Sequence, residues 1–323
     1  MEPAPAHLRV GDIKIWPLLD GRMTVAAPPG MPTEDSPDFD VHAGYVQNGM
    51  WLLDLGGFLV QSGDRLVLVD AGSGPGDGQL FAPPPFTGLD DADPALLDWV
   101  AAMGMTDPAQ IEMVLGAFTR TDIRTGSLGA NLAALGFRPE DVTDVLLSHL
   151  HFDHIGWVSK DGRPYFPNAV VRCEQNDAEH FLAPDHDDSL YLVMWNAMPT
   201  ADRMKPVLDR FEPWSGDVTI APGIECRHSP GHTPGSSIFS ISSGSEQALI
   251  LGDSVHCPQE LLDPEFCANT DMDPAQADHT RELIRSEIER GTVHVSASHF
   301  PGLRFGRLLV GDRPRSWTFA WDR

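Results

Sequence analysis

The stretch SHLHFDHIG, residues 148–156, decides how this chain folds and what it can bind. It follows the apolar run 145–147, which is typical of a buried strand. Two of its histidines alternate, so an extended backbone puts both imidazoles on one side, and an aspartate and a third histidine follow in the next loop. These candidate metal ligands are His149, His151, Asp153 and His154. A polar loop with unrelated histidines is the alternative, but this grouping at the end of one strand favours a metal site.

Three further candidate ligands stand just after apolar runs in the second half of the chain. His232 lies in the turn-rich segment PGHTPG, Asp253 ends the segment LGD, and His299 lies in SHF. Each alone is weak evidence, because turns commonly carry histidine or aspartate. Together with the first stretch they place seven candidate ligands at strand-to-loop junctions, where one site can assemble.

The seven candidates are sufficient for two metal ions. One ion would take His149, His151 and His232, the other would take Asp153, His154 and His299, and Asp253 would bridge them. Two ions about 3.5–4 Å apart can share a hydroxide, lower its pKa and polarise a scissile group. Imidazoles and carboxylates without thiolates suit zinc, while manganese, iron and cobalt also fit.

The composition narrows the class of partner. The chain has 323 residues and a formal net charge of -25. Such a charge repels nucleic acid and anionic membranes, and it argues against a polyanionic substrate. We therefore expect a small neutral or apolar substrate and no nucleic-acid or membrane partner, with a homodimer left open.

Several features favour a cytoplasmic protein. The first ten residues lack a basic start followed by an apolar core, and no window has the roughly 20 apolar residues that span a bilayer. The chain has four cysteines, widely spaced and without a CxxC pair, which indicates reduced thiols rather than disulfides.

Strand-like and helix-like segments alternate through two halves, and we expect one domain over residues 1–323 with insertions near 73–125 and 184–214. The Asp20-Gly21 pair predicts a hairpin turn. The expected strands are 13–18, 23–25, 57–60, 66–69, 145–147, 169–172, 218–220, 224–227, 237–241 and 248–251, with 293–295 as the last. The expected helices are 94–103, 108–118, 127–135, 175–182 and 275–290.

The motifs HLHFDH, PGHTPG, LGD and SHF, in this order, resemble the metallo-β-lactamase superfamily of dinuclear hydrolases. Within it, the chain is most similar to the methyl parathion hydrolase branch and its quorum-quenching lactonase relatives. The resemblance implies an α/β fold, a four-layer αββα sandwich with the site at one edge. It also implies that Asp70, after the strand 66–69, supports the metal loop from behind the ligands.

One position departs from many acyl-homoserine lactonases. Those enzymes carry a tyrosine three positions after the bridging aspartate, where it contacts the substrate carbonyl, whereas this chain has His256. The methyl parathion hydrolase group also has histidine there. We expect Asp153 or His256 to act as a catalytic residue that passes on a proton.

These observations predict a dinuclear metal-dependent hydrolase of a neutral ester, lactone or phosphotriester that uses a metal-bound hydroxide. An acyl-homoserine lactonase is the alternative. A redox or binding member of the same fold is less favoured, because two-iron redox members typically carry glutamate where His151 stands.

Aromatic residues near the metal loop and in the insertions are candidates for a substrate pocket. They are Phe81, Phe86, Trp157, Tyr191 and Trp195. Each could equally be core packing. Core packing or ordinary polar contacts are also the expectation for His228, His294 and Cys257, and no role is assigned to His180 or His186.

Overall fold

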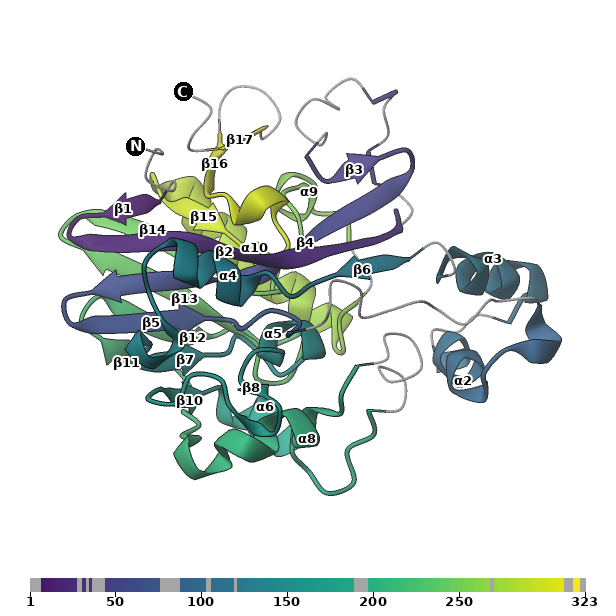
Figure 1. The fold of residues 1–323 in the computed structure, drawn as a ribbon. Helices are drawn as coiled ribbons and strands as arrows, with labels where there is room; N and C mark the ends of the chain where they lie inside the picture. The colour runs from purple at the N-terminus through teal and green to yellow at the C-terminus, as the bar shows by residue number, and fades with distance from the viewer. Residues whose placement is uncertain are drawn as a thin grey trace.

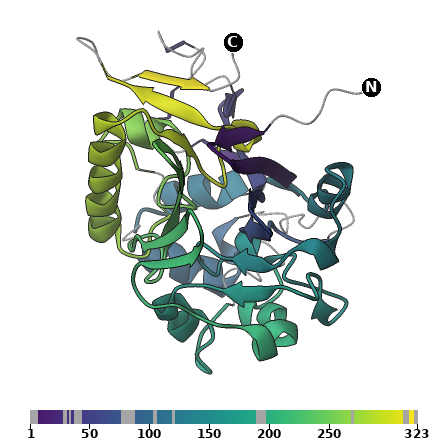
Figure 2. The ribbon, with the colours of Figure 1, turned by 90° about the vertical axis from the view of Figure 1, so that its left-hand side faces the viewer.

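The structure, a computed structural model, is a sandwich of two β-sheets with helices on both outer faces (Figure 1, Figure 2). It describes residues 7–27, 31–32, 35–36, 44–75, 88–102, 106–118, 121–188, 197–267, 270–310 and 316–319.

The first sheet is built from the first half of the chain. Its strands run in the order β1-β2-β4-β5-β7-β10, with β3 beside β4 and β6 beside β2. Strands β5, β7 and β10 are parallel neighbours, and the other pairs are antiparallel. The bounds are β1 Leu8–Val10, β2 Ile13–Ala26, β3 Val46–Gln47, β4 Met50–Ser62, β5 Arg65–Val69, β6 Asp122–Arg124, β7 Asp144–Leu146 and β10 Val170–Arg172.

The second sheet keeps its strands in chain order, from β11 to β17. Only β14 and β15 pair in parallel within it. The bounds are β11 Val218–Ala221, β12 Ile224–His228, β13 Ser237–Ser243, β14 Glu246–Ile250, β15 His294–Ser296, β16 Gly306–Leu309 and β17 Ser316–Phe319. A separate two-stranded ribbon pairs β8 Ser159–Lys160 with β9 Arg163–Pro164.

Helices cover the outer faces of the sheets, with α10 on the second sheet and α4, α6 and α8 on the first (Figure 1, Figure 2). The helices are α2 Pro94–Ala102, α3 Pro108–Phe118, α4 Leu128–Ala134, α5 Phe152–Ile155, α6 Gln175–Phe181, α8 Thr200–Met204, α9 Gln259–Leu262 and α10 Pro274–Arg290. The 3-10 turns are η1 Leu89–Asp91, η2 Pro139–Asp141, η3 Lys205–Arg210 and η4 Pro301–Leu303. No described helix is both long and apolar enough to cross a membrane.

Alternation along the central strands explains the four layers. Val67 and Val69 of β5 face the second sheet, whereas Leu66 and Leu68 pack against the helices of the first sheet. Strand β14 alternates in the same way, because Ile250 packs between the sheets whereas Leu249 and Leu251 pack under α10. Strands covered on both faces are apolar at successive positions, as the sequence predicts. The predicted αββα sandwich is therefore confirmed.

The predicted hairpin at Asp20-Gly21 is wrong. Strand β2 continues to Ala26 and pairs with β4 on both sides of a register shift between Leu19 and Gly21. The buried Asp20 carboxylate accepts hydrogen bonds from backbone N–H groups of two other segments, among them Ser73 and Leu128. A β-bulge, and not a turn, therefore uses the Asp-Gly pair.

The strand 293–295 is not the last one, because β16 and β17 follow it as an antiparallel pair. Strands β1 and β3 are also absent from the sequence-based prediction, and each has only two or three residues. Such short strands carry too little alternation to be recognised. The predicted helices, by contrast, agree with α2, α3, α4, α6 and α10 to within a residue or two at each end.

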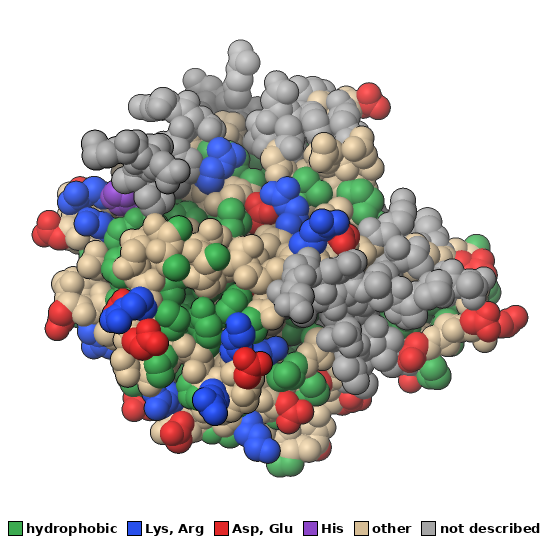
Figure 3. Space-filling view, in the orientation of Figure 1, with side chains coloured by type: hydrophobic (Ala, Val, Ile, Leu, Met, Phe, Trp, Pro, Cys, Tyr) green, Lys and Arg blue, Asp and Glu red, His purple; other side chains and the backbone are tan. Residues whose placement is uncertain are grey.

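The helices α2 and α3 of the first insertion lie at one edge of the molecule (Figure 1). Acidic side chains gather at this end, whereas basic and acidic side chains are interspersed over the rest of the face shown in Figure 3. The negative charge of the chain is therefore unevenly distributed on this face.

Candidate metal centre

The seven candidate ligands meet where several strands end. His149 and its neighbours follow β7, Asp253 follows β14, and His299 follows β15. Because β14 and β15 are parallel neighbours, their carboxyl ends lie at the same edge of the second sheet. Ser237 N donates to Ser148 O at 2.9 Å and joins this edge to the loop after β7 of the first sheet.

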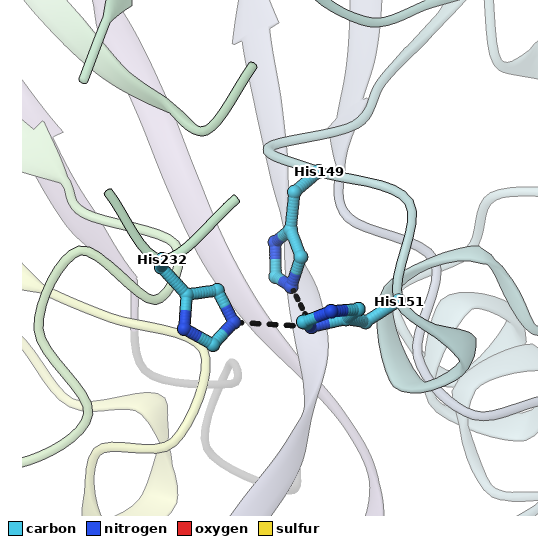
Figure 4. Close-up of side chains that lie close together, drawn as sticks. All are labelled: His149, His151 and His232. Atoms are coloured by element: carbon cyan, nitrogen blue, oxygen red, sulfur yellow. Dashed lines mark hydrogen bonds between the residues drawn. The ribbon is translucent and has the colours of Figure 1, made fainter. Parts of the chain in front are cut away.

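Three imidazoles face one another in the first part of the centre (Figure 4). Nε2 of His149 lies 2.9 Å from Nδ1 of His151, and that same Nδ1 lies 3.0 Å from Nε2 of His232. The backbone at His151 is extended, so the alternation expected from the sequence places the first two rings on one side. Three ring nitrogens converge as they would around a single cation.

The second part of the centre contains Asp153, His154 and His299. Asp153 and His154 lie on the single helical turn α5, which replaces the loop that the sequence predicts. Asp153 Oδ2 is 3.6 Å from His299 Nε2, and Asp153 Oδ1 is 3.9 Å from His154 Nε2. All three ligand atoms lie within 4.8 Å of one another.

Asp253 lies between the two groups. Its Oδ2 is 3.1 Å from Nε2 of His299 and 3.3 Å from Nε2 of His154 on one side. On the other side the same oxygen is 3.7 Å from Nε2 of His232 and 4.0 Å from Nε2 of His149. One carboxylate oxygen therefore reaches both groups, which is the arrangement expected of a bridge.

Two buried atoms of the centre make no hydrogen bond within the described part of the chain, His154 Nε2 and Asp253 Oδ1. Burying polar atoms in this way costs free energy unless something else satisfies them. Both belong to the candidate ligands, so divalent cations would satisfy them. The donor set of imidazoles and carboxylates is also the chemistry that zinc and related ions bind.

The electrostatics differ between the two parts of the centre. Burial, followed by the neighbouring imidazoles, lowers the pKa of His149 and His151 well below the usual value, and burial lowers the pKa of His232. These rings are therefore neutral, which is the form that binds metal. In the second part, burial opposes the charged forms of His154 and His299, but the neighbouring carboxylates, Asp253 above all, outweigh it. The pKa of His154 is raised well above the usual value and that of His299 to about 8, so both rings would release a proton on binding metal.

Asp70 holds the centre from behind, as the resemblance implies. Its Oδ2 lies 3.0 Å from Nδ1 of His154 and accepts hydrogen bonds from the hydroxyls of Ser148 and Ser298, each at 2.9 Å. Its Oδ1 accepts Ser148 N at 2.7 Å. Contact with Nδ1 leaves Nε2 of His154 directed at the other candidate ligands.

His299 is oriented through the backbone. Its Nδ1 lies 2.9 Å from Asp54 O, and this leaves Nε2 directed at Asp253. The Asp54 carboxylate is itself held by Gly302 N and by Nε of Arg22, each at 2.6 Å. No motif in the sequence marks Asp54, because β4 lies far from the ligand motifs along the chain.

Asp177 on α6 joins two of the ligand loops and was also missed. Its carboxylate accepts Leu150 N at 2.9 Å and Gly235 N at 2.6 Å, in the segments that carry His151 and His232. Burial outweighs these hydrogen bonds and raises the pKa of Asp177 to about 6.

This raised pKa predicts a pH effect on stability. A carboxyl whose pKa is higher in the folded than in the unfolded chain contributes stability below its unfolded pKa of about 4, and loses it as the pH rises through about 6. We expect the free energy of unfolding of the wild type, relative to Asp177→Asn, to rise by about 1 kcal/mol between about pH 7.5 and pH 5. Urea unfolding of both proteins at each pH measures it. A pH-independent difference would contradict it, and Asp217→Asn, outside the centre, is the control.

His256 lies beside the bridging aspartate. Its Nε2 is 3.7 Å from Asp253 Oδ2 and 3.0 Å from Thr270 Oγ1. Its Nδ1 lies 3.3 Å from Glu260 Oε2, and that oxygen also accepts His256 N at 2.6 Å. His256 therefore lies at the centre, where the sequence comparison expects it, with Nδ1 facing Glu260 and Nε2 facing both Thr270 and Asp253.

The substrate-pocket prediction fails for Trp157. Its side chain is 4% exposed, donates Nε1–H to Asp20 at 2.8 Å, and packs edge-on against Tyr165. It therefore belongs to the core under the first sheet, where the buried Asp20 carboxylate satisfies its indole N–H. The other four candidates, Phe81, Phe86, Tyr191 and Trp195, lie outside the described residues.

A cavity of about 540 Å³ lies next to the centre. Phe181, in its wall, packs edge-on against His151 with ring centroids 5.4 Å apart, and Met272 N donates to His232 O. The lining residues are Glu179, His180, Phe181, Ala183, Asp185, His186, Asp187 and Met272. No role is predicted for His180 or His186 from the sequence.

The other residues considered from the sequence have structural roles. Nε2 of His228 lies 2.9 Å from Pro234 O, and His294 accepts a hydrogen bond from Nε of Arg307. All four cysteines are free thiols, and Cys257 is fully buried in a core cluster.

Fold and site together define a class of protein, an αββα sandwich with a centre rich in histidine and aspartate at the strand ends. The model of the metallo-beta-lactamase superfamily matches residues 57–299, about three quarters of the chain. The chain therefore belongs to the metallo-β-lactamase superfamily, which confirms the resemblance seen in its motifs.

Known proteins add detail. An N-acyl homoserine lactonase of a Bacillus species is 30% identical over 120 residues, which cover 37% of this chain and 41% of the relative. The chain spans about half the length of the curated relatives it matches. The structure of AidC, a dizinc quorum-quenching lactonase solved with a product, aligns with this chain with a TM-score of 0.70 at 21% identity. The alignment covers 97% of this chain and 96% of the AidC chain. The hydrolase AbOPH has a TM-score of 0.67 at 24% identity, covering 98% of each chain.

Proposed function

We propose that this chain is a dinuclear metal-dependent hydrolase of neutral esters, lactones or phosphotriesters. One observation carries the proposal: a single oxygen of Asp253 lies within 4.0 Å of ring nitrogens from both groups of candidate ligands. A site for one ion has no need of a carboxylate shared in this way.

The seven candidates would then hold two ions, most simply zinc, as in the dizinc neighbour AidC. When bound, two such ions supply an acidified water and positive charge at the carbonyl or phosphoryl oxygen. Among the candidates, His151 and Asp153 are the most exposed, at 9% and 8%, so the substrate would approach from their side. We propose that Asp153 or His256 passes a proton to the departing oxygen.

The cavity beside Phe181 argues against an anionic substrate. Its lining contains three carboxylates and two imidazoles but no lysine or arginine among the described residues. The part of a substrate that enters this cavity would meet negative charge, so an anionic group there is disfavoured. Lactone opening is the second candidate, favoured by the similarity to N-acyl homoserine lactonases, whereas His256, which stands where many lactonases carry tyrosine, argues against it.

Metal analysis and an activity panel test this function. We expect about two divalent ions per chain in metal-replete protein, and turnover of phenyl acetate, an aryl phosphotriester or a lactone that chelation abolishes and added Zn²⁺ restores. Elemental analysis that finds one ion or none would contradict the dinuclear site. Two bound ions without turnover of any panel member would contradict the hydrolase.

His256→Ala should separate catalysis from metal binding. We expect kcat to fall about 10²-fold while metal content stays at the wild-type level, because each proposed ion has three other ligands. A ring nitrogen of His256 also lies within 4.8 Å of ligand atoms of His232 and Asp253, so the metal content of the variant distinguishes the two roles. Steady-state kinetics and elemental analysis measure the two properties. Loss of metal in this variant would make His256 a ligand, and unchanged kcat would remove its catalytic role. His279→Ala, on the exposed side of α10, is the control.

A further inference from the structure

A buried arginine on α10 contacts three parts of the centre. Arg281 is 2% exposed and lies on the helix face that carries Ala277, Ile284 and Ile288 into the core. A charge at such a position must be paired, because an uncompensated buried charge costs several kcal/mol. Its guanidinium pairs with two buried carboxylates and one backbone oxygen, and also with the exposed carboxylate of Asp278 at 3.5 Å.

The first carboxylate leads to a candidate metal ligand. Nη2 of Arg281 donates to both oxygens of Asp271, at 2.9 and 2.8 Å. Asp271 Oδ1 in turn lies 3.3 Å from Nδ1 of His232. A carboxylate behind Nδ1 fixes the ring and directs Nε2 at the other ligands.

The second carboxylate leads to the candidate catalytic histidine. Nη2 of Arg281 lies 3.7 Å from Glu260 Oε1, and Glu260 Oε2 holds both Nδ1 and the backbone N of His256. The third contact runs from Nε to Ser254 O at 3.0 Å, next in the chain to the bridging Asp253.

We propose that Arg281 is a positioning residue that keeps His232 and His256 in a fixed relation to each other across the centre. Two buried carboxylates repel, and a shared planar cation lets both stay close behind their imidazoles. Arg281 thus has two branches, one through Asp271 to His232 and one through Glu260 to His256. The functional meaning of the inference rests on the proposed metal centre, because it assigns the Asp271 branch to metal binding and the Glu260 branch to the reaction of the substrate.

Arg285 provides a matched control. It lies one turn further along α10 and is 5% exposed, so its loss perturbs the same helix face. It donates to Glu260 O and to the carboxylate of Glu282, and not to an acid side chain that contacts an imidazole of the centre. A purely structural role of the buried charge predicts the same result for both arginines.

The test compares Arg281→Met with Arg285→Met by Co²⁺ titration of metal-free protein. For Arg281→Met we expect one of two cobalt ions to bind about 10- to 100-fold more weakly and the visible spectrum to change. For Arg285→Met we expect wild-type affinity and spectrum, even where thermal unfolding shows an equal loss of stability. Wild-type cobalt binding in folded Arg281→Met, or equal effects in both variants, would overturn the inference.

Single-branch variants keep the inference testable if Arg281→Met does not fold. Asp271→Asn should weaken cobalt binding, and Glu260→Gln should keep both ions but lower kcat more than it changes KM. Arg281→Lys, which keeps the charge without the planar fork, should show a weaker form of both effects. Loss of metal in Glu260→Gln, or unchanged cobalt affinity in Asp271→Asn, would overturn the assignment of branches.

The proposed function can fail separately. Wild-type protein that takes up no Co²⁺ would refute the metal centre but not the positioning. The tautomer of His232 in metal-free protein then tests the positioning role of Arg281, and long-range ¹H–¹⁵N spectra measure it. We expect the proton on Nδ1, toward Asp271, in the wild type and in Arg285→Met, and a mixture of tautomers in Arg281→Met. One unchanged tautomer in all three proteins would overturn the inference.

Discussion

Replacing Asp253 by alanine is expected to lower turnover about 10³-fold or more, the equivalent of about 4 kcal/mol of transition-state stabilisation, and to release at least one metal ion. The reason is the position of its carboxylate, whose Oδ2 is 3.1 Å from His299 Nε2 and 3.7 Å from His232 Nε2. Without it, two like cations lose their shared counter-charge. Steady-state kinetics with phenyl acetate and elemental analysis on the same sample measure both effects.

Two companion variants make this result specific. Asp253→Asn keeps the shape but removes the charge, and it should lose most of the activity as well. Asp263→Ala, in the loop after α9, changes the same residue type outside the centre and should behave as wild type. Near-wild-type turnover in Asp253→Ala would mean that the bridge is assigned wrongly.

Replacing Asp70 by alanine is expected to lower the free energy of unfolding by about 3–5 kcal/mol and to impair metal binding. The buried carboxylate satisfies Ser148 N and the hydroxyls of Ser148 and Ser298, and it faces Nδ1 of His154. Alanine would leave these groups unpaired and free the ring of His154. It would also adopt, less readily than aspartate, the left-handed backbone at this position, where φ is 59°.

Denaturant unfolding of metal-free and metal-replete protein separates the two consequences. Asp70→Asn tolerates the same backbone and keeps one acceptor, so its loss of stability should be smaller. Asp64→Ala, on the exposed turn between β4 and β5, is the control. A metal affinity unchanged in Asp70→Ala would show that His154 needs no support from behind.

Much of the fold could be predicted because its signals are local. Val67 and Val69 alternate with leucines along one strand, and the apolar spacing of Ile284 and Ile288 marks α10 within one segment. Short strands such as β1 and β3 carry no such pattern. The pair Asp20-Gly21 is a turn signal in isolation, and only contacts with segments more than 50 residues away make it part of a bulge.

The candidate ligands were also determined by the sequence alone, since each stands in a short motif at the end of a strand. Their division into two groups around Asp253 is consistent with the distances between ring nitrogens and carboxylate oxygens. The role of Trp157 could not be predicted from the sequence, because an aromatic residue near a metal loop has the same local pattern whether it lines a pocket or fills the core.

The network behind the ligands was decided only by the tertiary structure. Asp54, Asp177 and Asp271 carry no motif, and each reaches the centre through a contact with a distant segment. Glu260 contacts His256 four residues before it, but its link to Arg281 also depends on how the separate elements pack. The sequence marks Arg281 only as a charged residue on the apolar face of a helix. Its partners depend on how α10 packs against the second sheet. Ligand types and their spacing are local properties of the chain, whereas the orientation of each imidazole depends on hydrogen bonds that form only when separate elements pack together.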